Sequence, residues 1–524
     1  MRGWMKEEIV DLLPPAFFED PISLIKKMRG EVIKESGLHF AAIFSIRDGR
    51  KIFLKKYKTK GTFVYLKFFI LPSKARKEWT TAYQLKKREL PVPEPFGWME
   101  RVCKGFVKES YYLSEAIGSG ILSVEDGEWL RRSHSIEELA KTMKRIHEVG
   151  LFHKDLHARN FLWHEGSFFL TDFHRGEIIR HLSLDQILWD FSYLFHSLRA
   201  IWGEEEQFAF ISVYFKGNPL SFRNKETLLK RIQSMIDRRQ RRHWRSGTKG
   251  CLKESAEFSI HKEKGIHIYR RRDYPLDQIK KMVETHLHVT IEEPSSLVKH
   301  SQKTTVSILD DGRSKVAVKQ FRYPHLWEKM KDYFRRSKAL KSWIAGNGLR
   351  TRGIPSLLPL ALVERKNGLW VKDRFFLMET SGDHRELDRY ILRGFKDFRK
   401  KRDFIRTFTH WLSHFHRMNL YHRDMKTSNI VVTEKGGSWN FYFLDLEDVA
   451  LNAKVGERRL FKNFLQLHTS LPKIITQMDR FRFFKEYLHQ NPIIKDRKDF
   501  IRRLIEQSKR RGYSYTLPFV RTIS

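Results

Sequence analysis

The sequence predicts an α+β chain that contains two tandem copies of one domain, each with a β-rich N-terminal lobe and a helical C-terminal lobe. Three observations support this prediction. The 524 residues exceed the length at which one hydrophobic core normally stops growing. A ten-residue motif occurs twice, and the spacings around it are kept. Each copy begins with hairpin signals and continues with helical periodicity.

Each predicted N-terminal lobe contains alternating apolar residues around an Asp-Gly turn. The segment HFAAIFSIRDGRKIFLKKY turns at Asp48 and Gly49, and TTVSILDDGRSKVAVKQF turns at Asp311 and Gly312. Alternation on both sides of Asp-Gly is typical of a β-hairpin, because this pair tolerates the left-handed backbone of a tight turn. Both copies are therefore expected to open with antiparallel strands.

The order of elements after these hairpins is the same in both copies. SKARKEW ends at Trp79 and SKALKSW ends at Trp343, in each case 24 residues after a strand lysine, Lys55 or Lys319. The proline-bearing turns LPVPEPFGW and GIPSLLPLA follow, and then apolar, strand-like runs. Because the similarity extends over about two hundred residues per copy, it indicates a duplicated domain rather than a repeated motif.

Helical periodicity is clearest just ahead of the repeated motif. IEELAKTMKRIHEV and FIRTFTHWLSHFHRM carry apolar residues at helical spacing. His147 and His416 lie at the ends of these segments, six residues before the motif histidine, and we expect them to pack rather than to catalyse. Trp79 and Trp343 are likewise expected in the core rather than against a ligand.

The two copies predict a first domain at residues 1–225 and a second domain at residues 256–524. Residues 226–255 between them are predicted to form a basic helical linker. Its tract at 238–249 is expected either to be a solvated helix face or to contact anionic lipid and glycan. The aromatic run GTFVYLKFFILP at 61–72 is expected to pack inside the first N-terminal lobe rather than to anchor the protein to a membrane.

Charge and cysteine content restrict the partners and the compartment. The net charge of +38 favours polyanionic partners: anionic lipid, phosphorylated glycan, nucleotide or nucleic acid. Cys103 and Cys251 are the only cysteines and form no partner motif, so a reduced, cytoplasmic compartment is expected. Acids and prolines interrupt the N-terminus, and no apolar run reaches ~18 residues, so neither a secretory signal nor a membrane span is expected.

The repeated motif carries the residue types that phosphoryl transfer from ATP requires. LFHKDLHARN contains Asp155 and Asn160, and LYHRDMKTSN contains Asp424 and Asn429, with five residues from Asp to Asn in each. In this chemistry one Asp accepts the proton of the attacking hydroxyl, while the Asn and a second Asp hold magnesium. The second aspartates follow strand-like runs: Asp172 in FFLTDF and Asp445 in YFLDLED.

These motifs resemble the protein-kinase-like fold and, more closely, the lipopolysaccharide core kinases that phosphorylate heptose or Kdo. The closer likeness depends on SKAxKxW after the strand lysine, a proline turn before the hinge, and Asp-Phe-His or Asp-Leu-Glu where protein kinases have Asp-Phe-Gly. It covers nearly all of both copies. The resemblance implies ATP and Mg²⁺ as cofactors, a lipopolysaccharide core precursor as acceptor, and a cytoplasmic location, peripheral at the anionic inner-membrane surface.

The resemblance also assigns a role to each matching residue. Asp155 and Asp424 are the expected catalytic bases. The expected magnesium ligands are Asn160, Asp172, Asn429 and Asp445. The expected nucleotide-binding residues are Lys55, Glu78 and Lys319, with Glu78 holding Lys55 in place. His153 and His422 are expected to shape the catalytic loops, and Asp190 and Asn463 to brace these loops from the next helix.

The second copy departs from the family pattern at Ser342, the position that Glu78 occupies in the first copy. Lys319 thus lacks its usual partner, and the second copy is expected either to be less active or to hold this lysine with another acid, which the sequence does not identify. Neither copy carries a Gly-x-Gly-x-x-Gly loop. The first copy offers only Gly37 and the second the glycine-free SQKTTVS, so a backbone phosphate cradle is not predicted.

Other functions are compatible with the same residues. A protein or small-molecule kinase of this fold would share the catalytic residues, because these do not define the acceptor pocket. A pseudokinase scaffold, above all in the second copy, would bind partners without turnover. Binding to RNA is suggested by the charge of +38 alone and is not favoured, because no RNA-binding module is recognisable.

Overall fold

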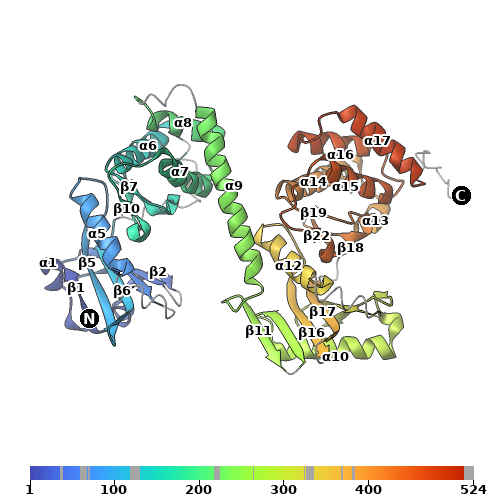
Figure 1. Ribbon diagram of the computed structural model, residues 1–524, viewed down its shortest axis with the longest axis horizontal. Coiled ribbons are helices and arrows are strands. Elements are labelled where there is room, and N and C mark those ends of the chain that lie inside the picture. Colours follow the sequence, from blue (N-terminus) through green and yellow to red (C-terminus); the bar gives the residue numbers. More distant parts are fainter. Residues whose placement is uncertain are drawn as a thin grey trace. The chain divides into compact units, whose positions relative to one another are not determined.

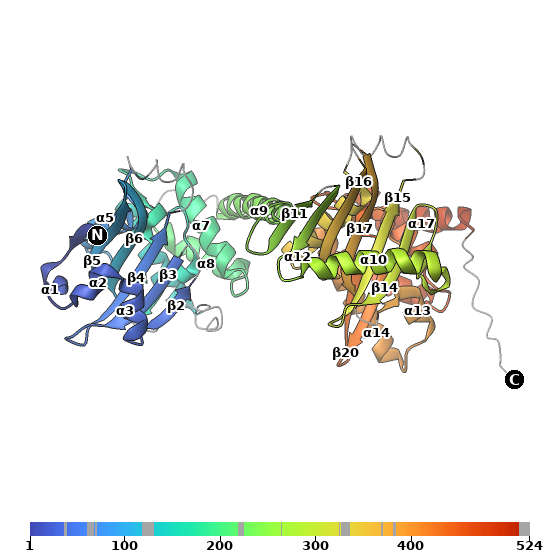
Figure 2. The same cartoon turned by 90° about the horizontal axis from the view of Figure 1, so that it is seen from below.

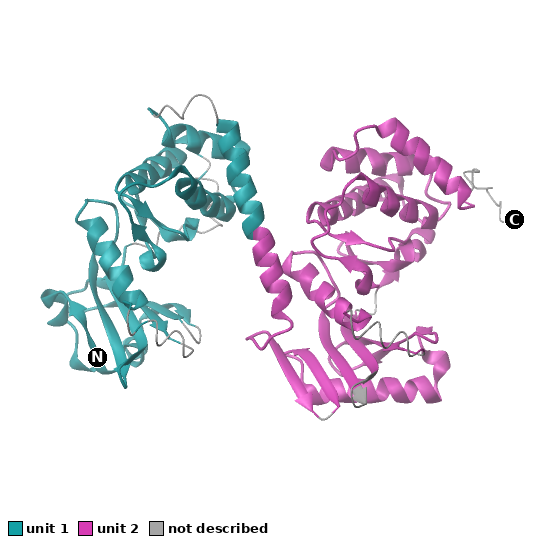
Figure 3. Cartoon of the chain, in the orientation of Figure 1, with its two compact units in different colours: residues 1–239 teal, residues 240–524 magenta. Residues whose placement is uncertain are grey.

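The computed structural model describes residues 1–35, 39–59, 68, 71–117, 130, 132–217, 225–263, 265–323, 325, 336–367, 370–380 and 384–512. Gly37 and most of the aromatic run at 61–72 lie outside the described residues. The chain forms two compact units, residues 1–239 and 240–524, which contain the first and the second copy (Figure 3). Each unit combines an antiparallel sheet with a group of helices (Figure 1), so the predicted α+β class is confirmed.

The first unit begins with a six-stranded sheet in the order β1-β5-β6-β4-β3-β2. Its strands are β1 (Arg2–Met5), β2 (Glu31–Glu35), β3 (His39–Ser45), β4 (Lys51–Lys58), β5 (Pro95–Cys103) and β6 (Phe106–Glu115). The accompanying helices are α1 (Glu7–Val10), α2 (Pro15–Glu19), α3 (Pro21–Lys27) and α5 (Lys74–Lys86). Apolar side chains of α1 to α3 pack on one face of the sheet, and α5 lies against the other face and the helical lobe.

The C-terminal lobe of the first unit is helical apart from short strand pairs. Its helices are α6 (Ser133–Glu148), α7 (Leu184–Leu198), α8 (Glu204–Tyr214) and the part of α9 (Lys225–Gly250) that precedes Gln240. The short elements are β7 (Leu151–Phe152), η3 (Ala158–Asn160), β8 (Phe161–His164), β9 (Ser167–Leu170), η4 (Phe173–Arg175) and β10 (Glu177–Ile178).

The second unit begins with a seven-stranded sheet in the order β11-β12-β16-β17-β15-β14-β13. Its strands are β11 (Phe258–Glu263), β12 (Ile266–Arg271), β13 (Lys299–His300), β14 (Thr304–Asp310), β15 (Lys315–Arg322), β16 (Pro359–Asn367) and β17 (Trp370–Thr380). The accompanying helices are α10 (Leu276–Glu292), η6 (Pro294–Ser296) and α12 (Lys338–Thr351). Figure 2 shows α10 lying across the strands, and its Ile279, Met282 and Val283 belong to the apolar cluster on that face.

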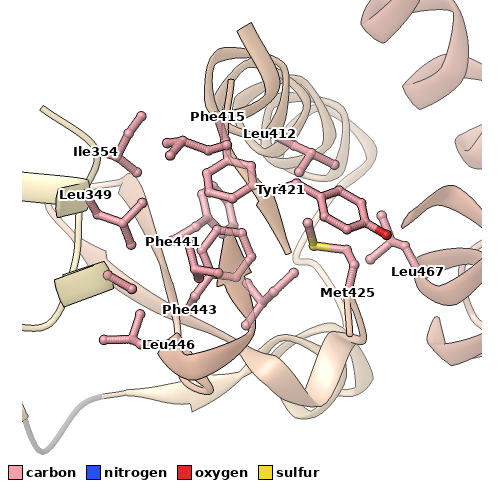
Figure 4. Close-up of a cluster of buried hydrophobic side chains, with 14 of the residues drawn as sticks. Leu349, Ile354, Leu412, Phe415, Tyr421, Met425, Phe441, Phe443, Leu446 and Leu467 are labelled. Carbon is pink, nitrogen blue, oxygen red and sulfur yellow. The ribbon is translucent and has the colours of Figure 1, made fainter. Parts of the chain in front are cut away.

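The C-terminal lobe of the second unit repeats the arrangement of the first. Its helices are α13 (Leu387–Leu392), α14 (Phe398–Arg417), α15 (Glu457–Ser470), α16 (Gln477–Gln490) and α17 (Arg497–Arg510). The short elements are β18 (Arg385–Glu386), β19 (Tyr421–His422), η7 (Thr427–Asn429), β20 (Ile430–Lys435), β21 (Ser438–Phe443), η8 (Leu446–Asp448) and β22 (Val449–Ala450). Phe415, Phe441, Phe443 and Leu446 pack together in its core (Figure 4).

Both predicted Asp-Gly hairpins are confirmed. β3 pairs with β4 and β14 with β15, and the turn residues Gly49 and Gly312 have φ of +85° and +82°. Glycine adopts this left-handed backbone without the steric cost that a Cβ brings. The two predicted helices ahead of the repeated motif are confirmed as α6 and α14.

Helix α9 continues through glycines whose composition favoured a turn. A Cβ on Gly247 would lie 2.5 Å from the Cγ2 of Thr351 on α12, so the glycine allows close packing of the two helices. Further along α9, Thr248 accepts a hydrogen bond from Arg352 at 3.1 Å. The C-terminal part of α9, from Gln240 on, belongs to the second unit, and these contacts place it beside α12.

Candidate active sites

The strand lysine of the first copy lies between two carboxylates from other elements. Lys55 on β4 has its Nζ 3.2 Å from Oε1 of Glu78 on α5 and 2.8 Å from Oδ1 of Asp172, just before η4. Tyr57, two residues along the same strand, donates its hydroxyl to Glu78, and His174 bonds to Asp172. The structure therefore brings together three of the predicted site residues of this copy.

Burial and charge shift the proton affinities in this cluster. Burial tends to lower the pKa of Lys55, but the charges of Glu78 and Asp172 outweigh it and leave the pKa raised. Burial would raise the pKa of Asp172, but the hydrogen bond to His174 and the charge of Lys55 hold it well below its usual range. The cluster therefore presents a fixed ammonium beside an ionised aspartate.

The predicted base of the first copy, Asp155, is half-buried and accepts from basic groups. Its carboxylate oxygens lie 2.9 Å from Nε2 of His157 and 3.1 Å from Nη1 of Arg175. Burial raises its pKa, but the hydrogen bond and charge of His157 lower it more, so the net shift is downward. Asn160 donates its side-chain amide to the backbone oxygen of Asp155 at 3.0 Å, which joins the predicted base and a predicted magnesium ligand in one loop.

A buried aspartate holds the first catalytic loop from α7. Both carboxylate oxygens of Asp190 accept backbone N–H groups, those of His153 and Lys154, each at 2.9 Å. Beside it, His147 lies in the core and hydrogen-bonds the hydroxyl of Tyr214 at 2.8 Å, so its predicted packing role is confirmed. Fully buried Asp190 thus satisfies two loop donors that would otherwise lack partners.

In the second copy the lysine has an acidic partner that sequence reasoning missed. Lys319 on β15 lies 2.7 Å from Oδ1 of Asp445 and 2.8 Å from Oε1 of Glu447 in η8. Ser342 on α12 donates its hydroxyl to the other oxygen of Glu447 at 3.0 Å. Burial tends to lower the pKa of Lys319, but the charges of Glu447 and Asp445 leave it raised, as in the first copy.

The change of acid involves three matched positions that differ together. The first copy has Tyr57, Glu78 and His174, and the second has Phe321, Ser342 and Glu447. The helix glutamate of the first copy accepts from the tyrosine hydroxyl, whereas Phe321 has no hydroxyl to donate. The carboxylate has moved from the helix to the third residue of the Asp-Leu-Glu motif, and the serine now supports it.

The second catalytic loop has the same backbone scheme with different side chains. Asn429 donates to the backbone oxygen of Asp424 at 2.8 Å, as Asn160 does to Asp155. The carboxylate of Asp424 lies 3.0 Å from Nζ of Lys426, which takes the place of the histidine in the first copy. Asn463 on α15 donates to the backbone oxygen of His422 at 2.7 Å and so contacts this loop from the next helix.

His416 is confirmed as a packing residue and gives the second unit a dependence on pH. It is buried and hydrogen-bonds the hydroxyl of Tyr487 at 2.6 Å and Oδ1 of Asn463 at 3.2 Å. Burial lowers its pKa to about 4, although the bond to Asn463 opposes this shift. The folded protein therefore keeps this imidazole neutral at pH values where an exposed histidine is protonated.

We expect the second unit to lose stability as the pH falls from 7.5 to 5. The unfolded chain binds a proton at His416 near pH ~6.5, whereas the folded chain does so only near pH 4, so proton uptake favours unfolding throughout this window. The loss at pH 5 amounts to about 2 kcal/mol for this histidine. Urea denaturation of the full chain should show a smaller pH dependence for His416→Gln; an unchanged dependence contradicts the assignment.

The glycine-free segment SQKTTVS of the second copy contains the connection between β13 and β14. Between β13 and β14, the hydroxyl of Ser301 accepts from the N–H of Thr304 at 3.0 Å and donates to its carbonyl oxygen at 2.9 Å, which closes the turn with a side chain.

The two tryptophans that were expected to pack in the core contact other side chains of their own lobes. Trp343 is fully buried, and Trp79 is half-buried and stacks on Tyr83.

Two further observations concern metals and membranes. In the described part of the chain, no group of three or more His, Cys, Asp or Glu side chains could hold a metal by itself. Magnesium commonly uses one or two protein ligands together with phosphate oxygens, which is compatible with the Asn and Asp pairs of the two copies. None of the helices that the structure describes has the length and apolar character of a membrane-crossing segment.

Comparison with known proteins identifies similarity in both units. The model of the lipopolysaccharide kinase (Kdo/WaaP) family matches residues 25–214 and 291–487. No curated protein matches the chain. Among solved structures, the chain is similar to the one described as "WaaP in complex with acyl carrier protein", with 19% identity and a TM-score of 0.34 over 45% of this chain and 99% of that chain.

Proposed function

This chain belongs to the lipopolysaccharide kinase (Kdo/WaaP) family, and from that premise we propose that it transfers the γ-phosphoryl group of ATP to a heptose or Kdo hydroxyl of the lipopolysaccharide core. The observation that carries the proposal is the pairing of the strand lysine with the aspartate that follows the β8–β9 hairpin or the β20–β21 hairpin, in both copies. Lys55 meets Asp172 at 2.8 Å and Lys319 meets Asp445 at 2.7 Å. Phosphoryl transfer uses this pair to hold the nucleotide phosphates.

The side chains in these clusters fit ATP and magnesium. Asp172 and Asp445 are about one-third exposed, at 33% and 30%, whereas the lysines beside them are only 17% and 7% exposed. A partly accessible, ionised carboxylate is the ligand type that Mg²⁺ prefers. Asn160 and Asn429 would supply the second protein oxygen. When bound, magnesium neutralises charge on the transferred phosphoryl group.

Asp155 and Asp424 would act on the acceptor. The lowered pKa of Asp155, in which the hydrogen bond to His157 overcomes the effect of burial, keeps it as a carboxylate at neutral pH. It would orient the sugar hydroxyl and accept its proton during in-line attack. Asp190 fixes the backbone of this loop through two hydrogen bonds. The backbone position of Asp155 is therefore set by a residue other than Asp155 itself.

We propose that the second copy is also competent to bind nucleotide. Glu447 supplies the carboxylate that Ser342 lacks, at a distance from Lys319 of 2.8 Å. The matched change from Tyr57 to Phe321 removes a hydroxyl that would otherwise need the helix acid. Replacement at all three positions together supports a second copy that still holds its lysine for nucleotide, rather than one that has become a scaffold without turnover.

The reaction is proposed to occur at the cytoplasmic face of the inner membrane. A net charge of +38 and exposed Arg238, Arg241 and Arg242 on α9 would draw the protein to anionic headgroups. Binding to vesicles that contain anionic lipid should be strong at low salt and fall as salt rises. Equal binding to neutral vesicles would argue against this location.

The decisive test uses γ-labelled ATP, magnesium and two classes of acceptor. We expect label in the core lipopolysaccharide precursor and none in a generic protein substrate. Mild hydrolysis and analysis of the sugars should then locate the phosphate on heptose or Kdo. Label in the protein alone would favour a protein kinase, and label in neither acceptor would favour a scaffold.

A further inference from the structure

A pocket in the second unit is surrounded by five basic side chains, which we call the basic pocket. Its cavity measures about 320 Å³ and is lined by Arg245, Lys249, Arg336, Lys341 and Arg423. All five residues are exposed. They come from three parts of the chain: the end of α9, the start of α12, and the catalytic loop before Asp424. Three segments that are distant in sequence therefore place their positive charges around one pocket.

The five basic side chains of this pocket have no counter-charge paired with them in the part of the chain that the structure describes. Among the residues that the structure describes, none of the five side chains forms an ion pair or a hydrogen bond. Glu447 is the one acid among the lining residues, and its two oxygens are occupied by Lys319 and Ser342. Like charges this close repel one another unless a counter-charge is present.

The first copy contains a carboxylate at the corresponding place. Glu177 lies 2.6 Å from Lys154 and 3.9 Å from Lys77. The hydrogen bond from Lys154 lowers the pKa of Glu177, so the group stays ionised. The first copy thus carries its own acid, which pairs with both of its lysines.

The two copies match position by position around this carboxylate. Lys154 and Arg423 each precede the predicted base, and Lys77 and Lys341 each lie four residues after the serine that caps α5 or α12. In the strand pairs, Glu177 lies opposite Phe152 and Ala450 opposite Tyr421, at the same register. Ala450, which lines the basic pocket, therefore replaces Glu177.

The second copy lacks that acid and has gained cations. Arg245 and Lys249 are four residues apart on α9 and so lie on one face of that helix. Contacts of α9 with α12 place this face beside the pocket, since Arg352 donates to Thr248 and to the carbonyl oxygen of Gly348, at 3.1 and 2.7 Å. The change from Glu177 to Ala450 removes one negative charge while α9 adds two positive charges.

We propose that the basic pocket binds an anion bearing a phosphoryl group, which supplies the charge that Glu177 supplies in the first copy. Guanidinium groups bind phosphate through paired hydrogen bonds, and lysines add mobile point charges. A cavity of about 320 Å³ accommodates a phosphate or pyrophosphate group with water. Free phosphate and a phosphate-bearing lipid headgroup present the same chemistry to this pocket, and the test below separates them.

The test restores the missing carboxylate in the full chain. Ala450→Glu should fill the pocket with the acid of the first copy, and Ala450→Gln is the uncharged control of the same size. Calorimetric titration with inorganic phosphate and pyrophosphate, at constant ionic strength, should give saturable binding for wild type and Ala450→Gln. Binding by Ala450→Glu should be at least about tenfold weaker.

Further arms separate the sources and protect the test against misfolding. Vesicles of phosphatidate in phosphatidylcholine distinguish a lipid headgroup from soluble phosphate. Binding of the probe that matches the true source should be weaker for Ala450→Glu than for Ala450→Gln, whereas binding of the other probe should not differ between these variants. Asn429→Ala should keep the effect, since Asn429 belongs to the predicted magnesium site and does not line the basic pocket. The double variant Arg245→Gln and Lys249→Gln, away from the catalytic loop, should weaken binding as Ala450→Glu does. Equal binding of every probe by wild type and Ala450→Glu would overturn the proposal.

Discussion

Replacing Asp155 by Asn is expected to lower phosphoryl transfer by the first copy by about 10²- to 10⁴-fold, the usual contribution of a positioned general base. Asn keeps the shape of the side chain and still accepts from Arg175, but it cannot take the proton of the sugar hydroxyl. The backbone brace from Asp190 to His153 and Lys154 does not involve the replaced group. Stability and nucleotide affinity should therefore change little while the rate falls.

The measurement has to separate the two copies. Rates of transfer from γ-labelled ATP are compared for Asp155→Asn, Asp424→Asn and the double variant, and the residual rate of each single variant reports the other copy. Asp185→Asn is the matched control: it removes the same charge from an exposed residue on α7 that pairs with Arg231. An unchanged rate for Asp155→Asn in the Asp424→Asn background would contradict the assignment of the base.

Much of the fold could be predicted because the two copies confirm each other. The hairpins at Gly49 and Gly312 carry strong local signals, and α6 and α14 have clear apolar stripes. The elements that sequence reasoning missed are those without a counterpart in the other copy. Helix α10 covers one face of the second sheet, whereas α1 to α3 do so in the first. Nothing in the duplication indicates such unmatched additions.

The C-terminal end of α9 could also not be predicted from the preferences of neighbouring residues alone. Gly247 and Gly250 favour a turn when only neighbouring residues are considered. In the folded chain Gly247 instead lets α9 approach Thr351 closely, and a contact between helices outweighs the intrinsic preference. Tertiary packing of this kind cannot be read from the segment alone.

The candidate site was predictable where one element supplies each function at a fixed spacing. Lys55, Glu78 and Asp172 meet as their spacing suggested. Glu447 was not predicted because the family pattern places the partner of the strand lysine on the helix, whereas this acid comes from a segment 105 residues beyond Ser342. Its signal was present in the sequence as a glutamate at the glycine position of the Asp-Phe-Gly motif.

The role of Glu447 leads to the second large expected effect. Glu447→Gln should weaken ATP binding by the second copy about ten- to a hundredfold, or ~1.4–2.8 kcal/mol, because it removes one charge from a buried pair. The side chains of Lys319 and Glu447 are only 7% and 12% exposed, so solvent screens the loss little. Nucleotide titration in an Asp155→Asn, Lys55→Ala background limits the signal to the second copy. The control is Glu457→Gln, at a side chain that is 38% exposed.

Restoring the acid on the helix should reverse this loss. Ser342→Glu alone adds a second carboxylate beside Glu447, in a buried position where like charges cannot both ionise cheaply, so it should also weaken binding. Combined with Glu447→Gln, the same Ser342→Glu recreates the arrangement of Glu78 and should recover most of the affinity. Two harmful changes that compensate each other imply direct coupling. Additive losses in the double variant would instead mean that Glu447 does not replace the helix glutamate.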